Sequence, residues 1–398
     1  MSTFEPLVVA PWRILSDSPP AAPPSCAGRV SEVARLEWWL GEPEDPLVLA
    51  EDFLASRGFP VKDLSTPRPA PGSSSHGRYG ASLLLSAAAG AAAVGGAVGA
   101  PSPAPAVPDL TIIVYAHGAP DPPQPDGPPI RLGGWEPSWP SSAHAAAVSS
   151  VRAAIAAGEV YQVNLVGHAS AGYRGDPMPA LRRVAALAGA RYGGVVGGAG
   201  WAVACASPET LLSVEGGRAV TRPIKGTRPA TAVGRAELLA SAKERAEHVM
   251  IVDLERNDLA RVAATGTVRV DELYGVRRWC DLWQAESVVS ARLREGVGLA
   301  EVLRALCPGG SVTGAPKLAA LDVVAALEPV GRGPSMGVAG WLGPDRLDLG
   351  LTIRTVAVDA DRVHVWAGGG ITWSSEPAAE VAEAAAKAAP LRAALAGL

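Results

Sequence analysis

Lysine is scarce in this chain of 398 residues, and its whole set is Lys62, Lys225, Lys243, Lys317 and Lys387. The chain is otherwise rich in Ala, Gly, Pro and Arg, as GC-rich coding produces. Arginine can satisfy a general need for positive charge. The few lysines that remain are therefore candidates for chemistry that arginine cannot perform.

Cysteine is also rare, and Cys26, Cys205, Cys280 and Cys307 are widely spaced with no CxxC pair. This usage predicts reduced, incidental thiols and a cytoplasmic protein. No basic stretch precedes an apolar run at the N-terminus, so we expect no signal peptide. The formal net charge is -4 and there is no long basic run, which argues against nucleic-acid binding.

The N-terminal part, residues 1–137, is rich in Ala, Gly and Pro between positions 66 and 108. Ala81–Ala100 carries no charge and is nearly long enough to span a bilayer, but it has few large aliphatic residues after Leu85 and no flanking anchors. We therefore expect a buried or partly disordered segment of small residues and no membrane span. Periodicity further predicts a helix over Ser31–Leu40, a short strand at Leu47–Leu49 and a strand over Leu110–Tyr115.

The pattern becomes more regular over residues 138–398. It predicts a helix capped by Ser141 or Ser142 and running to Ala157, a strand over Glu159–Leu165, and a long helix over Ala236–Ala263. It also predicts paired strands within Gly337–Val358, a strand over Trp366–Ile371 and a C-terminal helix.

The loop Thr221–Pro229 has the sequence TRPIKGTRP, in which two prolines bracket Lys225 and Gly226. Proline stiffens the chain, and glycine permits close approach of a ligand to the backbone. Neighbouring Arg222 and Arg228, with partial desolvation, would favour a neutral, nucleophilic lysine. A solvated surface lysine explains the loop equally well when the loop is considered alone.

Several carboxylates have spacings that fit both an ordinary and a functional role. Glu244 and Glu247 share one helix face, where a divalent cation would relieve their repulsion as well as solvent does. Glu380, Glu383 and Lys387 also share one face, which fits an ordinary Glu–Lys helix pair. A further acid, Glu209, lies in a turn at the surface or at the edge of a site.

Other segments are candidates for lining a ligand site. Gln162 and Asn164 face one side of a strand and can line an uncharged polar pocket. The glycine-rich loop Pro308–Lys317 can present backbone N–H groups. Arg354, among apolar strand residues, needs a carboxylate from the protein or a ligand. The run Gly368–Gly370 allows close approach to a backbone.

Taken together, the ordered motifs YQVNL, SPETLL, PIKGTRP, EHVMIVDLERNDL, PGGSVTGAPK, IRT and AGGGI resemble those of the chorismate-utilising enzymes. This family includes anthranilate synthase, aminodeoxychorismate synthase, isochorismate synthase and salicylate synthase. The resemblance covers about residues 138–398 and is faint over residues 1–137. It implies an α/β (α+β) fold of packed antiparallel sheets with helices outside, and chorismate, a ring with two carboxylates, as substrate.

The resemblance also implies roles for individual residues. Mg²⁺ would be held by Glu247 and Glu383, with Glu244 and Glu380 outside them. The substrate-binding set would be Gln162, Gly226, Thr227, Thr313, Arg354, Gly368, Gly369, Gly370 and Lys387. Lys225 would be the nucleophile and Glu209 the proton donor.

Two positions distinguish the members of the family. Isochorismate and salicylate synthases carry a water-activating lysine where this chain has Gln162, so ammonia is the expected nucleophile. Anthranilate synthases usually carry alanine where this chain has Lys225, as in component I of aminodeoxychorismate synthase (the large subunit of para-aminobenzoate synthase). The resemblance therefore implies formation of 4-amino-4-deoxychorismate in folate or specialised metabolism, with ammonia from a separate glutamine amidotransferase subunit.

Two alternatives remain open at this point. One is a relative that makes anthranilate or 2-amino-2-deoxyisochorismate. The other is a non-catalytic homologue that binds chorismate, suggested by Pro334-Ser335-Met336 where the family commonly has a tyrosine.

Overall fold

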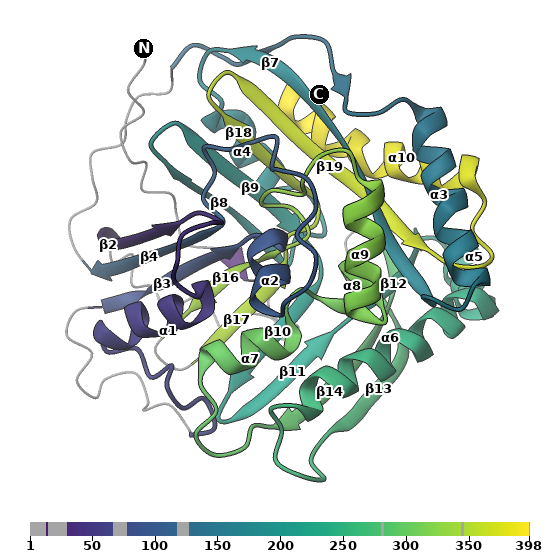
Figure 1. The fold of residues 1–398 in the computed structure, drawn as a ribbon. Helices are drawn as coiled ribbons and strands as arrows, with labels where there is room; N and C mark the ends of the chain where they lie inside the picture. Colours follow the sequence, from purple (N-terminus) through teal and green to yellow (C-terminus); the bar gives the residue numbers. More distant parts are fainter. Residues whose placement is uncertain are drawn as a thin grey trace.

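The computed structural model describes residues 13–14, 30–66, 78–117, 127–279, 282–343 and 346–397. The helices in these ranges are α1 (Pro46–Ser56), α2 (Ala87–Ala93), α3 (Ser141–Ala156), α4 (Met178–Ala185), α5 (Ala232–Ala240), α6 (Ala242–Ala260), α7 (Leu299–Leu306), α8 (Gly310–Thr313), α9 (Lys317–Leu327) and α10 (Pro377–Ala396) (Figure 1).

The described strands form two antiparallel sheets. The first has the order β1 (Arg13–Ile14), β8 (Tyr192–Gly198), β9 (Trp201–Ser207), β18 (Thr355–Asp359), β19 (Arg362–Ile371), β7 (Gln162–Arg174) and β15 (Gly314–Ala315), and β5 (Arg131–Leu132) and β6 (Glu136–Pro137) also pair with β7. The second has the order β12 (Ile224–Pro229), β14 (Leu282–Arg292), β11 (Arg218–Arg222), β10 (Thr210–Glu215), β17 (Arg346–Leu351), β16 (Val338–Leu342), β3 (Arg78–Leu85), β4 (Leu110–His117) and β2 (Val30–Trp38), with β13 (Arg269–Trp279) paired to β14.

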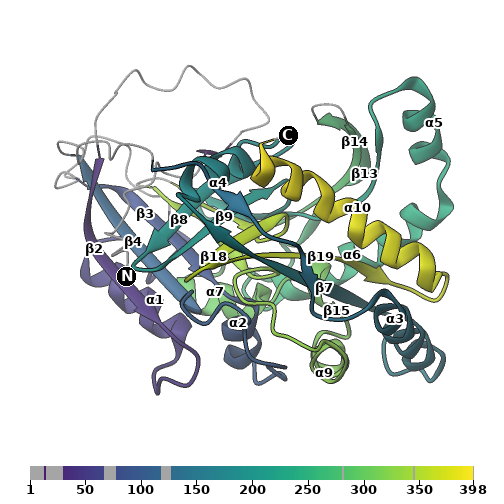
Figure 2. The same ribbon diagram turned by 90° about the horizontal axis from the view of Figure 1, so that it is seen from above.

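The two sheets share a large hydrophobic core to which both contribute, including Val203 and Trp366 from the first sheet and Leu83 and Leu349 from the second. A second core lies between the first sheet and helices α4 and α10. Figure 2 shows α4 and α10 lying along the outer side of that sheet. The predicted fold of packed antiparallel sheets with helices outside is confirmed.

The predictions for residues 31–49 were wrong. Ser31–Leu40 was predicted to be helical, but Val30–Trp38 is strand β2, because Ala34, Leu36 and Trp38 alternate toward the core. Leu47–Leu49 was predicted to be a strand but lies in helix α1. The backbone N–H groups of Leu47 and Val48 donate to the Asp45 carboxylate, and Pro46 starts the helix.

The long helix predicted over Ala236–Ala263 is two helices, α5 and α6. They meet at Ser241, whose hydroxyl accepts a hydrogen bond from the Glu244 N–H and so caps α6. The predicted cap of α3 was also wrong, since the N-cap is Pro140 and makes no side-chain hydrogen bond. The strand predicted over Glu159–Leu165 begins later, at Gln162.

The small-residue segment Ala81–Ala100 contributes most of β3 and all of α2, in which Ala87, Ala89 and Ala91 are buried. The strands predicted at Leu110–Tyr115 and Trp366–Ile371 and the C-terminal helix are confirmed. No helix in the described ranges is long and apolar enough to cross a membrane. Cys205 and Cys307 are free and buried, while Cys26 and Cys280 lie outside the described residues.

The boundary predicted at residue 137 stays a prediction. Strand β3 of the N-terminal part pairs along its length with β16 of the C-terminal part, from Leu85 opposite Val338 to Ala81 opposite Leu342. The two parts therefore share one sheet.

A buried ion pair joins several of these elements. Glu328 and Arg332 are 7% and 8% exposed, and their charged groups lie 2.7 Å apart. The Arg332 guanidinium also donates to the backbone oxygens of Val312 and Asn164, and the Glu328 carboxylate accepts from the Val166 N–H. The pair thus ties α8 and β7 to the segment that follows α9.

We predict that Arg332→Ala lowers the free energy of unfolding by about 3–5 kcal/mol, because it leaves the Glu328 carboxylate buried without its cation. Urea denaturation measures the change. Arg256→Ala is the matched control, because its pair with Asp253 is exposed and should contribute less than about 1 kcal/mol. Equal losses in the two variants would contradict the prediction.

Candidate active site

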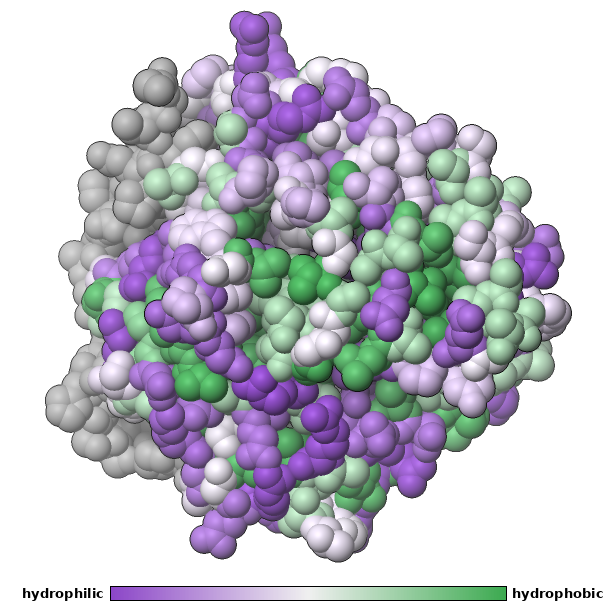
Figure 3. All heavy atoms as spheres, in the orientation of Figure 1, coloured by the Kyte–Doolittle hydropathy of each residue, from purple (hydrophilic) through white to green (hydrophobic). Residues whose placement is uncertain are grey.

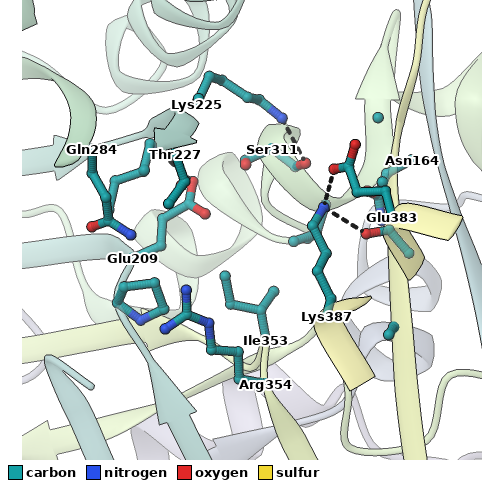
Figure 4. Close-up of a pocket in the computed structure, with 18 of the residues that line it drawn as sticks. Asn164, Glu209, Lys225, Thr227, Gln284, Ser311, Ile353, Arg354, Glu383 and Lys387 are labelled. Carbon is teal, nitrogen blue, oxygen red and sulfur yellow. Dashed lines mark hydrogen bonds and ion pairs between the residues drawn. The ribbon is translucent and has the colours of Figure 1, made fainter. Parts of the chain in front are cut away.

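A cavity of about 480 Å³ lies between the two sheets and helices α6 and α10 (Figure 4). Its lining includes all the site residues predicted from the sequence except Gln162 and Thr313. Those lining residues are Glu209, Lys225, Gly226, Thr227, Glu244, Glu247, Arg354, Gly368, Gly369, Gly370, Glu380, Glu383 and Lys387. Segments far apart in the chain therefore converge on one space.

Lys225 is placed in the cavity by the pairing of β12 with β14, where it lies opposite Ala285. The register shifts between Lys225 and Thr227, at Gly226, whose φ is +78°. A Cβ at Gly226 would lie 2.8 Å from Leu238 and 2.9 Å from the Glu244 carboxylate. Glycine is thus required here both by the backbone conformation and by the approach of α6.

The Lys225 side chain is half-buried, and its ammonium lies 3.4 Å from the backbone oxygen of Ser311. Glu209, which is 4% exposed, lines the same cavity. Burial raises the pKa of the Glu209 carboxyl, and the Lys225 charge opposes that shift. A carboxyl with a raised pKa beside an amine can exchange a proton with it.

The arginines flanking Lys225 are compensated by carboxylates. Arg222 pairs with Glu286 at 3.1 Å, and Arg228 lies 3.7 Å from Glu244. The sequence led us to expect uncompensated positive charge around Lys225. Instead, the cavity carboxylates of Glu209 and Glu247 lie near enough to interact with its charge.

Helices α6 and α10 carry the predicted carboxylates on facing sides of the cavity. Burial raises the pKa of Glu247, with lysine charges opposing and the carboxylates of Glu244 and Glu380 adding to the rise. Burial also acts to raise the pKa of Glu383, but the nearby lysines, Lys387 first, outweigh it and lower that pKa.

The prediction that Arg354 lies on a strand was wrong. It lies between β17 and β18 with φ +51°, a conformation that non-glycine residues rarely adopt and that interrupts a strand. Burial lowers the pKa of its guanidinium. Within the part of the chain that the structure describes, no carboxylate is paired with Arg354, although it lines the cavity. A half-buried guanidinium with no carboxylate partner among the described residues is suited to bind an anionic ligand.

The Gly368–Gly370 run of β19 forms another part of the cavity wall. A Cβ at Gly369 would lie 3.2 Å from Glu380, 3.6 Å from Lys387 and 3.7 Å from Glu383, so this position faces the charged side chains of α10. Lys387 donates to the Gly368 backbone oxygen at 2.9 Å and pairs with Glu383 at 2.7 Å. Figure 4 shows this pair across the cavity from Glu209.

Gln162 and Thr313 lie behind the cavity wall. Gln162 is 1% exposed and packs against Gly370, since a Cβ there would meet its amide nitrogen at 2.5 Å. Thr313 lines a second cavity of about 340 Å³, near α2 and α9, over which hydrophobic side chains gather in Figure 3. Neither the Gln162 amide nor the Thr313 hydroxyl has a hydrogen-bond partner among the described residues. Their predicted contact with substrate stays a prediction.

Other lining residues were not among the predicted site residues. Gln284 is 5% exposed on β14, and no motif marked it. Ser311 contributes through its place in the glycine-rich loop, and Asn164 through the strand face on which the sequence had placed it. Lys243 also lines the cavity, and its ammonium lies 3.8 Å from Glu247.

The cavity carries five acidic and five basic residues: Glu209, Glu244, Glu247, Glu380 and Glu383, with Lys225, Arg228, Lys243, Arg354 and Lys387. With all ten ionised, these charges cancel. A ligand with two carboxylates would add two negative charges, which a divalent cation would balance.

A family profile described as chorismate binding enzyme matches residues 100–393. The chain belongs to this family. The match includes every residue of the candidate site and most of the described structure.

Curated relatives carry two different names. The anthranilate synthase component 1 of Streptomyces coelicolor is 40% identical over 258 residues, which cover 63% of this chain and 50% of that protein. The aminodeoxychorismate synthase component 1 of Klebsiella aerogenes is 40% identical over 240 residues, which cover 58% of this chain and 53% of that protein. The matched region thus spans about half the length of these relatives.

A solved structure resembles nearly the whole chain. Anthranilate synthase component I from Streptococcus pneumoniae superposes with a TM-score of 0.72 and 25% identity, covering 95% of both chains. The likeness includes the N-terminal part, where the sequence resemblance was faint.

The donor set of the cavity fits Mg²⁺. Carboxylate oxygens on α6 and α10 are the ligands this ion prefers, and it completes its shell with water and substrate oxygens. Among the described residues, no three Asp, Glu, His or Cys side chains are already grouped around one point. Glu247 and Glu383 would therefore supply part of a site that the substrate completes.

We predict that Gly369→Ala weakens chorismate binding at least about tenfold, or about 1.4 kcal/mol, because the new methyl group fills part of the cavity wall and forces the Glu380 carboxylate, 3.2 Å away, to shift. Isothermal titration measures the affinity. Gly172→Ala on β7 is the control, since a Cβ there meets nothing within 4 Å. Unchanged affinity in Gly369→Ala would show that the glycine wall does not contact the ligand.

Proposed function

We propose that this protein is aminodeoxychorismate synthase component I, which converts chorismate and ammonia to 4-amino-4-deoxychorismate. The observation that carries the proposal is Lys225, whose amine lies in the cavity with the buried Glu209 carboxyl and the guanidinium of Arg354. A lysine so placed can act as a covalent nucleophile, which neither an alanine nor an arginine can do.

The first half of the reaction forms a bond between Lys225 and C2 of the ring. Glu209 accepts a proton from the Lys225 ammonium, and the free amine then attacks C2. Both ring double bonds shift, C1=C2 to C1=C6 and C5=C6 to C4=C5, and the C4 hydroxyl leaves as water with the proton that Glu209 returns. The raised pKa of Glu209 suits it to this exchange.

In the second half, ammonia adds at C4, both ring double bonds return to their first positions, and the Lys225 amine leaves C2. The enolpyruvyl group is retained. Lys225 then regains a proton, and the Glu209 carboxylate is ready for another turnover.

Substrate binding is assigned to the groups that surround these two. Arg354, Thr227 and the backbone N–H groups of the Gly368–Gly370 run bind the carboxylates, and Lys387 holds Glu383 in place. Mg²⁺ held by Glu247 and Glu383 would neutralise the ring carboxylate and the charge that develops beside it. Glu244 and Glu380 would act on that ion indirectly.

The ammonia is proposed to come from a separate glutamine amidotransferase subunit. The component 1 names of the relatives support such a partner. Gln162, with its unpartnered amide behind Gly370, cannot act as a base toward water, which favours ammonia over water as the nucleophile.

One observation favours a second candidate, anthranilate synthase component I. The Streptomyces coelicolor relative of that name is as similar in sequence as the Klebsiella aerogenes aminodeoxychorismate synthase, at 40% identity each. Incubation with chorismate, Mg²⁺ and ammonium separates the two. A product that a lyase converts to 4-aminobenzoate supports our proposal, and anthranilate contradicts it.

We predict that Lys225→Ala lowers kcat for 4-amino-4-deoxychorismate at least about a thousandfold, because the nucleophile is lost. Mass spectrometry of the wild type with chorismate and without ammonia should reveal a Lys225 adduct of chorismate less water. Lys62→Ala, which alters an exposed lysine, should retain both activity and adduct. Turnover by Lys225→Ala at the wild-type rate would exclude the covalent role.

We further predict that Glu383→Gln and Glu247→Gln each weaken Mg²⁺ binding in the presence of chorismate by at least about tenfold, because each removes an anionic oxygen ligand. Calorimetric titration with Mg²⁺ measures the effect. Glu159→Gln, an exposed glutamate away from the cavity, is the control. If neither cavity variant differs from this control, the metal does not bind there.

A further inference from the structure

A largely buried polar group, which contains three ionisable residues, is not used by the reaction above. It consists of Glu255 and Asp258 on α6, Thr221 on β11 and Lys317 at the start of α9, and we call it the Glu255 cluster. Glu255 and Asp258 are each 3% exposed, and Thr221 is 1% exposed. Figure 1 shows α6 passing beside β11 and below α8 and α9.

The contacts within the cluster differ between the two acids. The Asp258 carboxylate accepts a hydrogen bond from the Lys317 ammonium at 2.8 Å. Glu255 accepts from the Thr221 hydroxyl at 3.0 Å, so its hydrogen-bond donor is neutral. Lys317 also donates to the Leu306 backbone oxygen at 3.3 Å. The cation therefore stabilises the ionised form of Asp258 more directly than that of Glu255.

The cluster joins three segments that carry residues of the candidate active site. Helix α6 carries Glu247, β11 leads within four residues to Lys225, and the loop between Leu306 and Lys317 carries Ser311. The packing here is close, since a Cβ at Gly310 would lie 2.3 Å from Leu254, the neighbour of Glu255.

We propose that the Glu255 cluster retains one proton, on Glu255, and that this neutral form positions the Lys225 strand and the Ser311 loop against α6. Two ionised carboxylates with a single ammonium would leave a net negative charge in the interior, which is strongly unfavourable. With the proton on Glu255, the cluster is neutral. These are positioning residues, and their effect on catalysis rests on the proposed function.

The charged and titratable groups around Glu255 are consistent with a bound proton. Burial, then the charge of Asp258, raises the pKa of Glu255 to about 8, against the opposing effects of Lys317 and Thr221. The negative charge of Glu209, which lines the cavity, also raises the pKa of Glu255. Cys307 is also nearby, and burial raises the pKa of its thiol to about 12, so it stays neutral. Arg261 faces Asp258.

The stability of the fold should therefore fall as the pH rises through the neutral range. The pKa of Glu255 is about 8 in the folded chain, against 4.5 for an ordinary glutamate. Between these values the folded chain keeps a proton that the unfolded chain loses. The stabilising contribution of that proton is full below about pH 4.5 and is lost as the pH rises toward 8, by up to about tenfold in the folding equilibrium constant for each pH unit.

The test compares Glu255→Gln with Asp253→Asn, which removes an exposed carboxylate from the same helix. Unfolding by urea is measured from pH 5 to pH 9. We expect the folding equilibrium constant of Glu255→Gln to rise at least about tenfold relative to wild type across this range, while Asp253→Asn follows wild type. Infrared spectra at pH 6.5 should show a protonated carboxyl band that Glu255→Gln lacks.

The kinetic measurement is the pH at which kcat declines on the alkaline side. We expect this pH to be about one unit higher in Glu255→Gln than in wild type, and unchanged in Asp253→Asn. If Glu255→Gln does not fold, Thr221→Val serves instead. It removes a hydrogen bond that favours ionised Glu255, so the loss of stability should move to higher pH. A stability profile and carboxyl band identical to wild type in Glu255→Gln would overturn the proposal. The stability and infrared results need no turnover, so they stand or fall separately from the proposed function.

Discussion

The arrangement of the cavity depends on the buried guanidinium of Arg332. It donates to Glu328 and to the backbone oxygens of Val312 and Asn164, both of which line the cavity. Because these contacts join α8 to β7, the loop that carries Ser311 cannot shift without breaking charge-assisted hydrogen bonds in the interior. A buried ion pair contributes little net stability, but it penalises every alternative packing in which one partner is left alone. The cavity is therefore held in one geometry by contacts that lie outside it.

Charge balance is the second constraint. The ten charged residues of the cavity cancel one another, yet they are not evenly placed. Arg354 lies at one side, with no carboxylate partner among the described residues, and the carboxylates of α6 and α10 face each other at another. An anion with two carboxylates and a divalent cation together satisfy both regions, whereas either alone would leave a partly buried charge uncompensated. In the proposed function, the metal and the substrate would therefore depend on each other for binding.

The sequence predicted much of the candidate site because the relevant residues stand in compact motifs. Lys225, Gly226 and the Gly368–Gly370 run are local signals, and all of them line the cavity. Gln284 has no such signal, since its place is set by the pairing of β12 with β14. Thr313 shares a motif with Ser311, but the short helix α8 turns the two toward different cavities. The strand at Val30–Trp38 was mistaken for a helix because its alternation shows only against the core that β4 completes.

Overall similarity does not decide which product the chain makes, because relatives of both names are equally close over similar lengths. In the proposed mechanism, the decision lies in the chemistry at Lys225. When a lysine amine forms a bond to C2, the hydroxyl at C4 leaves and ammonia must add at C4. When no lysine is present, C2 itself is open to ammonia. In the proposed mechanism the cavity would bind the same ring in both cases, since Arg354 and the metal held by Glu247 and Glu383 would act on its carboxylates and not on the carbon that is aminated. Lys225 would then set the choice of product separately from the binding of the substrate.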